Sequence, residues 1–342
     1  MITFIVPTRN RLSHVKRTLK YVSHLPYQFI IADNSTLYNS LPKDIQLSEN
    51  VEYLFLENST FSNKVTTALS KVTTKYVAMI ADDDFFTLSG IKSCIDFLEK
   101  NENYSAVHGN TLGFFEAKNK VGFEKMYHHE NHVNCNNDDV IKRAIEMFSP
   151  YMPLFYSIHR TENFRKIFAT ELLPENLNFV EFKIALYAAV KGKFEVLPIL
   201  LHIREEALFS AGFTTKAIAD MPDDKEWNIK LNSFKNYVAN DITTLYQISD
   251  STASTIVESS ISSYINWVKS LPISNNKMSY AYFKKKYLKP YFPALFSWLV
   301  KQKKATEINR QQINHLNLSN YSNADILKEE LVLIESVILN VS

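Results

Sequence analysis

The stretch Lys75-Tyr-Val-Ala-Met-Ile-Ala-Asp-Asp-Asp-Phe-Phe86 joins an apolar run directly to a cluster of charge. Tyr76 to Ile80 is typical of a buried strand, and the consecutive carboxylates Asp82, Asp83 and Asp84 follow it. Because adjacent like charges repel and buried carboxylates need partners, a cation is expected at this tip. A hard divalent metal, held by one or two carboxylates together with substrate phosphates, is the natural candidate. A solvated acidic turn is the alternative interpretation.

Upstream of this stretch, strands and helices alternate. Residues 2–6 predict a strand stopped by Pro7, and helical spacing begins at Leu12, with Ser13 as its expected cap. Residues 29–33 and 51–56 predict two further strands, and 61–72 predict a helix. This alternation indicates an α/β fold with a doubly wound, largely parallel sheet. Ligands bind at the carboxyl ends of such strands, so three polar strand ends are expected on one shared edge.

Composition and length limit which kinds of protein this chain can be. The chain has 342 residues, 46% hydrophobic and 22% charged, which fits one large domain or two ordinary ones. A net charge of +2 gives no general attraction to nucleic acid, and six glycines without a glycine-rich loop exclude a Walker or dinucleotide motif. Cys94 and Cys135 are too few for a disulfide framework. No apolar run approaches the roughly 20 residues of a membrane span, so a soluble, cytoplasmic protein is expected.

Three motifs carry a resemblance to a known family. They are Ile5-Val-Pro-Thr-Arg-Asn10, Ile30-Ile-Ala-Asp-Asn-Ser35 and Ile80-Ala-Asp-Asp-Asp-Phe85. At these spacings they resemble the GT-A glycosyltransferases of family 2, and most closely a bacterial subgroup with Pro-Thr-Arg-Asn and Ala-Asp-Asp-Asp-Phe motifs. The resemblance implies a nucleotide-diphospho-sugar transferase domain, a nucleotide-sugar donor, and Mn²⁺ or Mg²⁺ on its diphosphate.

The same resemblance implies roles for individual residues, and it leaves open which two of the three aspartates hold the metal. For the nucleotide-sugar these residues are Pro7, Thr8, Arg9, Asp33, Lys64, Asp82 and Asp83, and for the metal they are Asp82 and Asp84.

Residues 179–198 resemble the family's acceptor-side helix, with Glu181 in the place of the catalytic base. Without the family, Ile184, Ala185 and Ala188 form a tight apolar face, and Gly192 is a reasonable C-cap. Glu181 is then expected in the first turn, where the helix dipole favours a carboxylate. A purely capping role is the alternative to catalysis.

His159 and Arg160 are further catalytic candidates, because an arginine near a diphosphate supplies paired donors for leaving-group charge. The segment 118–139 contains His128, His129, His132 and Cys135. Its spacing fits no standard zinc pattern, so a polar mobile loop over the site is the preferred interpretation.

The second half of the sequence is mainly helical, with helices expected at 227–246, 253–271, 276–304 and 324–339. We therefore expect a GT-A domain at 1–205 and a helical C-terminal domain at 206–342.

Residues 277–304 combine eight lysines and eight aromatics with no acidic residue. This composition favours contact with an anionic membrane surface, although Pro290 and Pro293 interrupt any long helix and a core helix with a basic face is the alternative. Nucleic acid is not expected as a partner, and an oligomer remains open.

The sequence therefore predicts a metal-dependent, inverting glycosyltransferase acting on a saccharide or lipid-linked saccharide, by resemblance in surface polysaccharide (capsule or O-antigen) synthesis. It is expected in the cytoplasm or at the inner face of the cell membrane. Two rivals are a non-catalytic GT-A-like scaffold at the membrane and a sugar nucleotidyltransferase. The second normally needs a glycine-rich N-terminal loop, and the first glycine here is Gly90.

Overall fold

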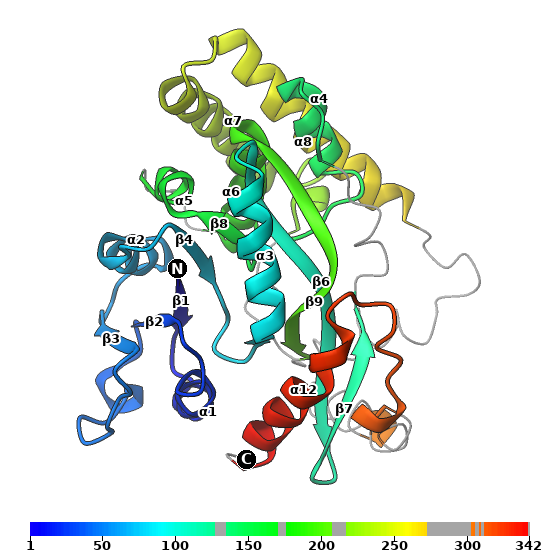
Figure 1. Ribbon diagram of the computed structural model, residues 1–342. Coiled ribbons are helices and arrows are strands. Elements are labelled where there is room, and N and C mark those ends of the chain that lie inside the picture. The colour runs from blue at the N-terminus through cyan, green and yellow to red at the C-terminus, as the bar shows by residue number, and fades with distance from the viewer. Residues whose placement is uncertain are drawn as a thin grey trace.

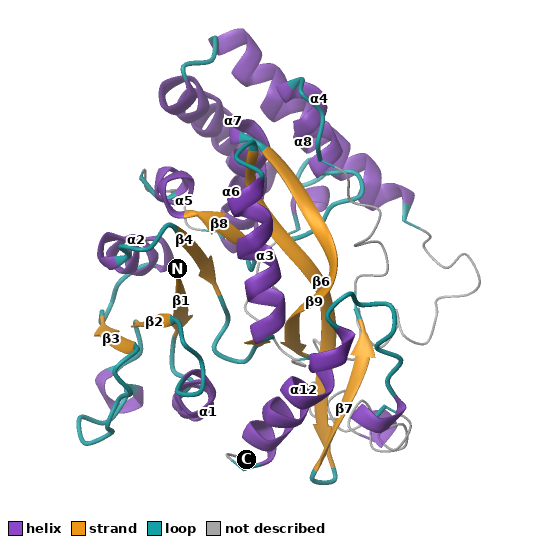
Figure 2. Ribbon diagram, in the orientation of Figure 1, coloured by secondary structure: helices purple, strands orange, loops and turns teal. Residues whose placement is uncertain are grey.

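The computed structural model describes residues 1–126, 135–169, 176–206, 217–271, 302–304, 308 and 311–340. These residues form the predicted α/β fold with a helical C-terminal region (Figures 1 and 2). The strands are β1 (Ile2–Thr8), β2 (Gln28–Asp33), β3 (Val51–Phe55), β4 (Tyr76–Met79), β5 (Phe85–Phe86), β6 (Tyr104–Ala117), β7 (Lys120–Lys125), β8 (Ile158–Arg160) and β9 (Lys193–Glu205). The α-helices are α1 (Leu12–Val22), α2 (Phe61–Lys71), α3 (Leu88–Lys100), α4 (Val140–Met147), α5 (Thr161–Ile167), α6 (Leu177–Lys191), α7 (Lys225–Tyr246), α8 (Asp250–Ser270) and α12 (Ala324–Leu339). Short 3₁₀ helices are η1 (Leu37–Asn39), η4 (Ile218–Asp220) and η7 (Ile313–His315).

The sheet has a parallel half and a mixed half. Within the described residues its order is β3-β2-β1-β4-β8-β6-β9-β5, with β7 paired to β6. Strands β3, β2, β1 and β4 are parallel, as predicted. The short strand β8 is antiparallel to both β4 and β6, so the sheet is less uniformly parallel than expected. Because the chain winds to opposite sides from β1, the edge between β1 and β4 is the switch point where α/β folds bind ligands.

Helices cover both faces of this sheet. Alternating residues of β1 point to opposite faces: Ile5 packs with α2 and α6, whereas Phe4 and Val6 pack with α1, α3 and α12. Helices α4, α7 and α8 gather beyond the end of α6, while α12 lies beside α1 and β7 (Figure 1). The C-terminal region thus contributes to the cores on both faces of the sheet.

Strand β9 is longer than the sequence indicated. The sequence beyond Pro198 carries no clear strand pattern, yet β9 runs from Lys193 to Glu205 alongside β6. The pairing passes from His108↔Val196 to Asn110↔Leu200, which leaves an irregularity around Pro198. Proline is tolerated at such a bulge because it has no ladder hydrogen bond to donate there.

The segment 118–139 is only partly the predicted loop. Lys120–Lys125 forms β7, which pairs with β6, and Cys135 is buried and bridges to Phe194. The candidate zinc histidines His128, His129 and His132 lie outside the described residues. The same holds for most of the basic and aromatic segment 277–304, of which only residues 302–304 are described. No helix in the described part of the chain is long and apolar enough to cross a membrane.

Candidate active site

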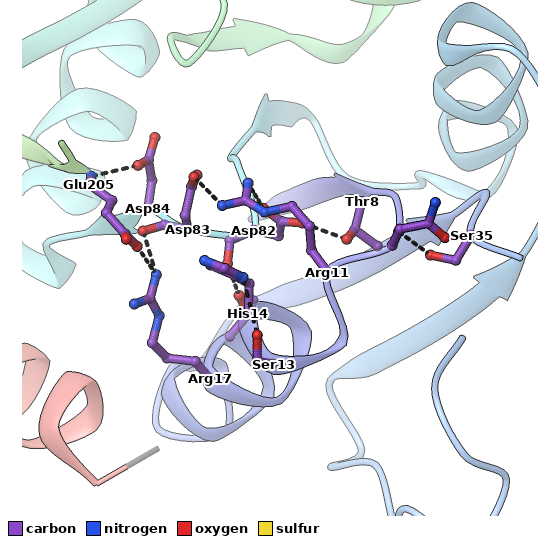
Figure 3. A network of polar contacts seen from close by, with 12 residues as sticks. Thr8, Arg11, Ser13, His14, Arg17, Ser35, Asp82, Asp83, Asp84 and Glu205 are labelled. Carbon is purple, nitrogen blue, oxygen red and sulfur yellow. Dashed lines mark hydrogen bonds and ion pairs between the residues drawn. The ribbon is translucent and has the colours of Figure 1, made fainter. Parts of the chain in front are cut away.

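The carboxylate of Asp82 lies at the switch point between β1 and β4, where it accepts hydrogen bonds from the Thr8 hydroxyl and the Arg11 guanidinium (Figure 3). Thr8, the last residue of β1, donates from Oγ1 to Asp82 Oδ2 at 2.5 Å, and Thr18 donates to the Asp82 carbonyl at 2.8 Å. Burial raises the pKa of Asp82 to about 6, while the Arg11 charge and the Thr8 hydrogen bond act in the opposite direction. The predicted meeting of these strand ends is therefore present.

The cation expected beside the aspartate triplet is supplied in the structure by Arg11. Its Nη1 lies 2.6 Å from Asp82 Oδ1, and its Nη2 lies 2.7 Å from Asp83 Oδ2. Arg17, six residues after Arg11 and within α1, donates to the Asp83 carbonyl at 3.0 Å and pairs with the carboxylate of Glu205. The two arginines thus bind the triplet from the residue before α1 and from the middle of α1.

Asp84 is turned away from this cluster and into the protein. Its Oδ2 lies 2.9 Å from His202 Nε2, and its Oδ1 accepts the Glu205 N–H at 2.9 Å. Burial and the neighbouring Asp83 charge raise the pKa of Asp84 well above its usual range. Burial and the Arg204 charge lower the pKa of His202 to about 3, so this contact is a hydrogen bond to a neutral imidazole near pH 7.

The expected metal pair is Asp82 and Asp84, but the position of the Asp84 side chain does not suit a metal ligand. The Asp84 side chain is 2% exposed and both of its oxygens are engaged, whereas the Asp83 side chain is 12% exposed and faces the same gap as Asp82. The geometry therefore favours Asp82 and Asp83 over Asp82 and Asp84. The donor set fits a hard cation, since carboxylate oxygens are the ligands of Mg²⁺ and Mn²⁺. Among the described residues no three acidic, histidine or cysteine side chains converge on one point, and a metal that also binds substrate phosphates needs only one or two carboxylates.

The other predicted nucleotide residues flank the same edge. Asp33, at the end of β2, accepts from Ser35 N at 2.7 Å and from the Tyr53 hydroxyl at 2.6 Å. Lys64 on α2 is buried and donates to Thr8 O and to Asn34 Oδ1, both at 2.9 Å, which ties the ends of β1 and β2 together.

The two remaining predicted nucleotide residues belong to β1 and the turn after it. Pro7 is half-buried within β1, opposite Ala32 of β2. Arg9 is exposed immediately beyond β1, and it precedes Arg11 by two residues.

Glu181 stands alone in an otherwise buried helix segment. From Phe179 to Val190 every residue of α6 is buried except Glu181, which is half-buried. The helix begins at Leu177 with Asn176 as its cap, so Glu181 lies in the second turn, and the expected place in the first turn is wrong. Burial raises the pKa of Glu181, while a hydrogen bond from Tyr151 and the Arg204 charge partly counteract this effect.

Arg204 and Tyr156 connect the aspartate cluster to Glu181. The positive charge of Arg204 lowers the pKa of both Asp84 and Glu181, so it is within electrostatic reach of both carboxyls. The Tyr156 ring lies 4.9 Å from the ring of His202, and its pKa is raised by burial and by the negative charges of Asp84, Asp83 and Glu181. These electrostatic effects indicate that Glu181 lies near Arg204, Tyr156 and the triplet.

His159 and Arg160 do not belong to that region. Both lie in β8, where Arg160 pairs with Tyr76 and His159 with Val77 at the beginning of β4, away from its carboxyl end. Arg160 donates to the carbonyls of Tyr104, Leu98 and Asn101, which neutralises the C-terminal end of α3. His159 is buried and bonded to Leu154 O, and burial lowers its pKa to about 4. The structure therefore gives both residues structural contacts in place of the expected catalytic role.

Sequence reasoning missed Arg11, Arg204, His202 and Tyr151 as site residues. A usable signal existed for two of them, because His202 and Arg204 are two residues apart in a strand and so share one face. Arg11 follows Arg9 by two residues in the turn after β1, which places it at the edge of the sheet. Nothing local in the sequence pairs Tyr151 with Glu181.

The first half of the chain matches a known family. Residues 3–166 match the profile described as Glycosyl transferase family 2. The match spans the strand ends that carry Asp33 and Asp82, and it ends before α6 and β9. A search of curated proteins gave no match.

Solved structures share the fold over nearly the whole chain. A Staphylococcus aureus TarS 1-349 structure superposes with a TM-score of 0.51 at 13% identity, covering 99% of this chain and 89% of that one. TarS 1-349 in complex with UDP-GlcNAc gives a TM-score of 0.51 at 14% identity, covering 99% and 90%. The chain spans 54% of the longer S. aureus TarS, at 12% identity and a TM-score of 0.48. At such identity the likeness shows a common fold, including the helical C-terminal region.

Proposed function

We propose that this chain, which is a glycosyltransferase, moves a sugar from a nucleotide-sugar to a hydroxyl of a saccharide or lipid-linked saccharide. The observation that carries the proposal is the meeting of Thr8, Asp33 and the aspartate triplet at the switch point, with Glu181 facing the same region. Because the related TarS 1-349 structure holds UDP-GlcNAc, a uridine diphosphate sugar is the first donor to test.

On the donor side, Asp82 and Asp83 would hold a Mn²⁺ or Mg²⁺ ion. Such an ion would neutralise the charge that develops on the departing nucleoside diphosphate. Asp33 and the turn of Pro7, Thr8 and Arg9 would receive the nucleoside. Lys64 stabilises that turn by donating hydrogen bonds to Thr8 O and to Asn34 Oδ1.

On the acceptor side, Glu181 would act as the general base. It takes the proton of the acceptor hydroxyl while that oxygen bonds to the anomeric carbon and the bond from this carbon to the diphosphate oxygen breaks. A single displacement of this kind inverts the anomeric configuration. The raised pKa of Glu181 supports the role, since a base works best when its pKa approaches the working pH.

Arg204 would stabilise the leaving group. Its guanidinium lies within electrostatic reach of both Asp84 and Glu181, and arginine offers paired donors to phosphate oxygens. The function that the sequence analysis gave to Arg160 thus fits Arg204 at the end of β9.

The biological setting follows from the family resemblance. We place the chain in surface polysaccharide synthesis, as in capsule or O-antigen assembly, in the cytoplasm or at the inner face of the membrane. Residues 277–304 would make the membrane contact there. Flotation with anionic liposomes tests this contact, and binding that persists unchanged after replacing Lys284, Lys285 and Lys286 contradicts it.

The activity is tested by nucleotide release from a panel of nucleotide-sugars, beginning with UDP-N-acetylglucosamine, with Mn²⁺, Mg²⁺ or EDTA. We expect metal-dependent release of the nucleoside diphosphate by the wild-type chain and its loss in Asp83→Asn. Release that is equally fast in EDTA contradicts the metal requirement, and no release from any donor under any condition contradicts the proposal itself.

A further inference from the structure

The contact between Arg11 and two aspartates fills the gap that a metal ion would need. Arg11 is the residue immediately before α1, and its two Nη atoms each bind one carboxylate, on Asp82 and on Asp83 (Figure 3). These are the same two carboxylates that the geometry favours as metal ligands. A guanidinium and a divalent cation repel each other, so they cannot share this gap.

The exposure of the partners decides which of them can move. The Arg11 side chain is 35% exposed, whereas that of Asp82 is 3% exposed and is also fixed by Thr8. Arg11 can therefore leave into solvent without disturbing packing, while Asp82 stays in place. Asp83 gains a free oxygen when Arg11 leaves, because its Oδ2 accepts the hydrogen bond from Arg11 Nη2.

We propose that Arg11 is an internal counter-ion of Asp82 and Asp83. A divalent cation displaces Arg11 from these carboxylates, and the freed Arg11 then binds the diphosphate of the donor. This inference rests on the proposed function. The freed guanidinium starts at the edge where the diphosphate must lie, and guanidinium–phosphate pairs are strong, directional contacts. Arg11 thus lowers the affinity for metal alone and raises the affinity for nucleotide with metal.

Two binding measurements on the full chain test the exchange. The first titrates Mn²⁺ without nucleotide and follows free Mn²⁺ by electron paramagnetic resonance. The second measures binding of UDP at saturating Mn²⁺ by calorimetry. Arg11→Met is the main variant, Arg11→Lys keeps the charge without the two-pronged contact, and Lys16→Met on the exposed side of α1 removes an equal charge nearby.

We expect opposite changes in the two assays. Arg11→Met should bind Mn²⁺ about tenfold more tightly and UDP about tenfold more weakly, each corresponding to about 1.4 kcal/mol. Arg11→Lys should fall between the wild type and Arg11→Met, and Lys16→Met should match the wild type. Thermal melting verifies that each variant is folded.

The outcomes separate this inference from the proposed function. If the wild type binds Mn²⁺ and UDP but Arg11→Met is unchanged in Mn²⁺ affinity, or shifts both affinities in the same direction, the exchange is overturned and the function stands. An equal gain in Mn²⁺ affinity for Lys16→Met also overturns it, because general charge then explains the effect. If the wild type binds neither ligand, both proposals are overturned.

Discussion

The hydroxyl of Tyr151 donates a 2.9 Å hydrogen bond to Oε1 of Glu181. The Tyr151 ring is held in turn by stacking on Phe148, 5.5 Å away at an interplanar angle of 7°, and Phe148 stacks on Phe182 of α6 at 4.1 Å. The carboxylate of the proposed base is thus oriented by a ring that the core fixes. Burial raises its pKa while this hydrogen bond limits the rise.

Glu181→Gln should separate chemistry from binding. The amide cannot accept the acceptor proton, so turnover should fall by about 10²–10⁴-fold, the usual value of general-base catalysis. Nucleotide affinity should stay at the wild-type value because, among the described residues, Glu181 bonds to Tyr151 and to none of Asp33, Asp82 and Asp83. Glu195→Gln, a carboxyl near the beginning of β9, is the control and should leave turnover unchanged. Near-normal turnover in Glu181→Gln contradicts the assignment of the base.

Tyr151→Phe should shift the pH dependence of turnover. A base is active above its pKa, so turnover is lost as the pH falls through the pKa of Glu181. The Tyr151 hydrogen bond lowers that pKa, and its removal should move the acidic limb of the kcat profile to higher pH. Tyr246→Phe on α7 is the matched control. An acidic limb that does not move, or moves to lower pH, argues against the contact.

Lys183→Met should destabilise the packing of α6 on α7. Lys183 Nζ lies 3.1 Å from Asp241 Oδ2 and 3.0 Å from the Tyr237 hydroxyl, and both charged side chains are under 8% exposed. Removing one partner leaves a buried charge, which typically costs about 3–5 kcal/mol of unfolding free energy. Urea unfolding measures the loss.

The control for this variant is Lys230→Met, which removes an exposed pair with Glu226 and should cost under about 1 kcal/mol. Combining Lys183→Met with Asp241→Asn should recover part of the loss, because no unpaired charge remains. Equal losses for Lys183→Met and Lys230→Met would show that the buried pair is unimportant.

The raised pKa of Glu124 predicts that the stability of the fold depends on pH. A hydrogen bond with the carboxyl of Glu206 and burial raise its pKa to about 7, against the opposing effects of Lys304 and Gln311. Because this pKa is above that of the unfolded chain, the stabilisation is complete at pH values below about 4.3 and is lost as the pH rises through about 7. The Tm should therefore fall between pH 5.5 and 8.

Glu124→Gln should flatten this part of the Tm profile, since an amide keeps a donor toward Glu206 at every pH. Glu102→Gln, an exposed carboxyl beyond α3, should keep the wild-type slope. Identical slopes in both variants would mean that the carboxyl pair does not control stability.

Local sequence patterns predicted the helices whose bounds depend on apolar spacing and on flanking polar residues. The helix beginning at Leu12 and the helix over residues 324–339 have the expected bounds, because apolar spacing and flanking polar residues mark both. The expected cap Ser13 is wrong: Arg11 is the cap residue, and its side chain makes no capping hydrogen bond. Arg11 is instead directed to the aspartates, a contact across 71 residues.

Long-range pairings could not be predicted in this way. Asp84 meets His202 and Glu205 only because β5 pairs with β9, which joins residues more than 100 positions apart. Periodicity within a segment carries no information on such partners. Arg160 was expected near the diphosphate and Arg204 was given no role for that reason, since the order of strands decides which arginine reaches the carboxyl ends of β1 and β4.

The central claim, that this edge of the sheet is a metal-assisted nucleotide-sugar site, is tested most directly by thermal melting with UDP and Mn²⁺, separately and together. We predict that UDP and Mn²⁺ together raise the Tm of the wild type by about 5 °C at 100-fold excess over Kd. UDP alone should raise the Tm by less. In Asp83→Asn, adding Mn²⁺ to UDP should give no further rise in Tm. A wild-type Tm that no nucleotide changes, with or without Mn²⁺, would contradict the account.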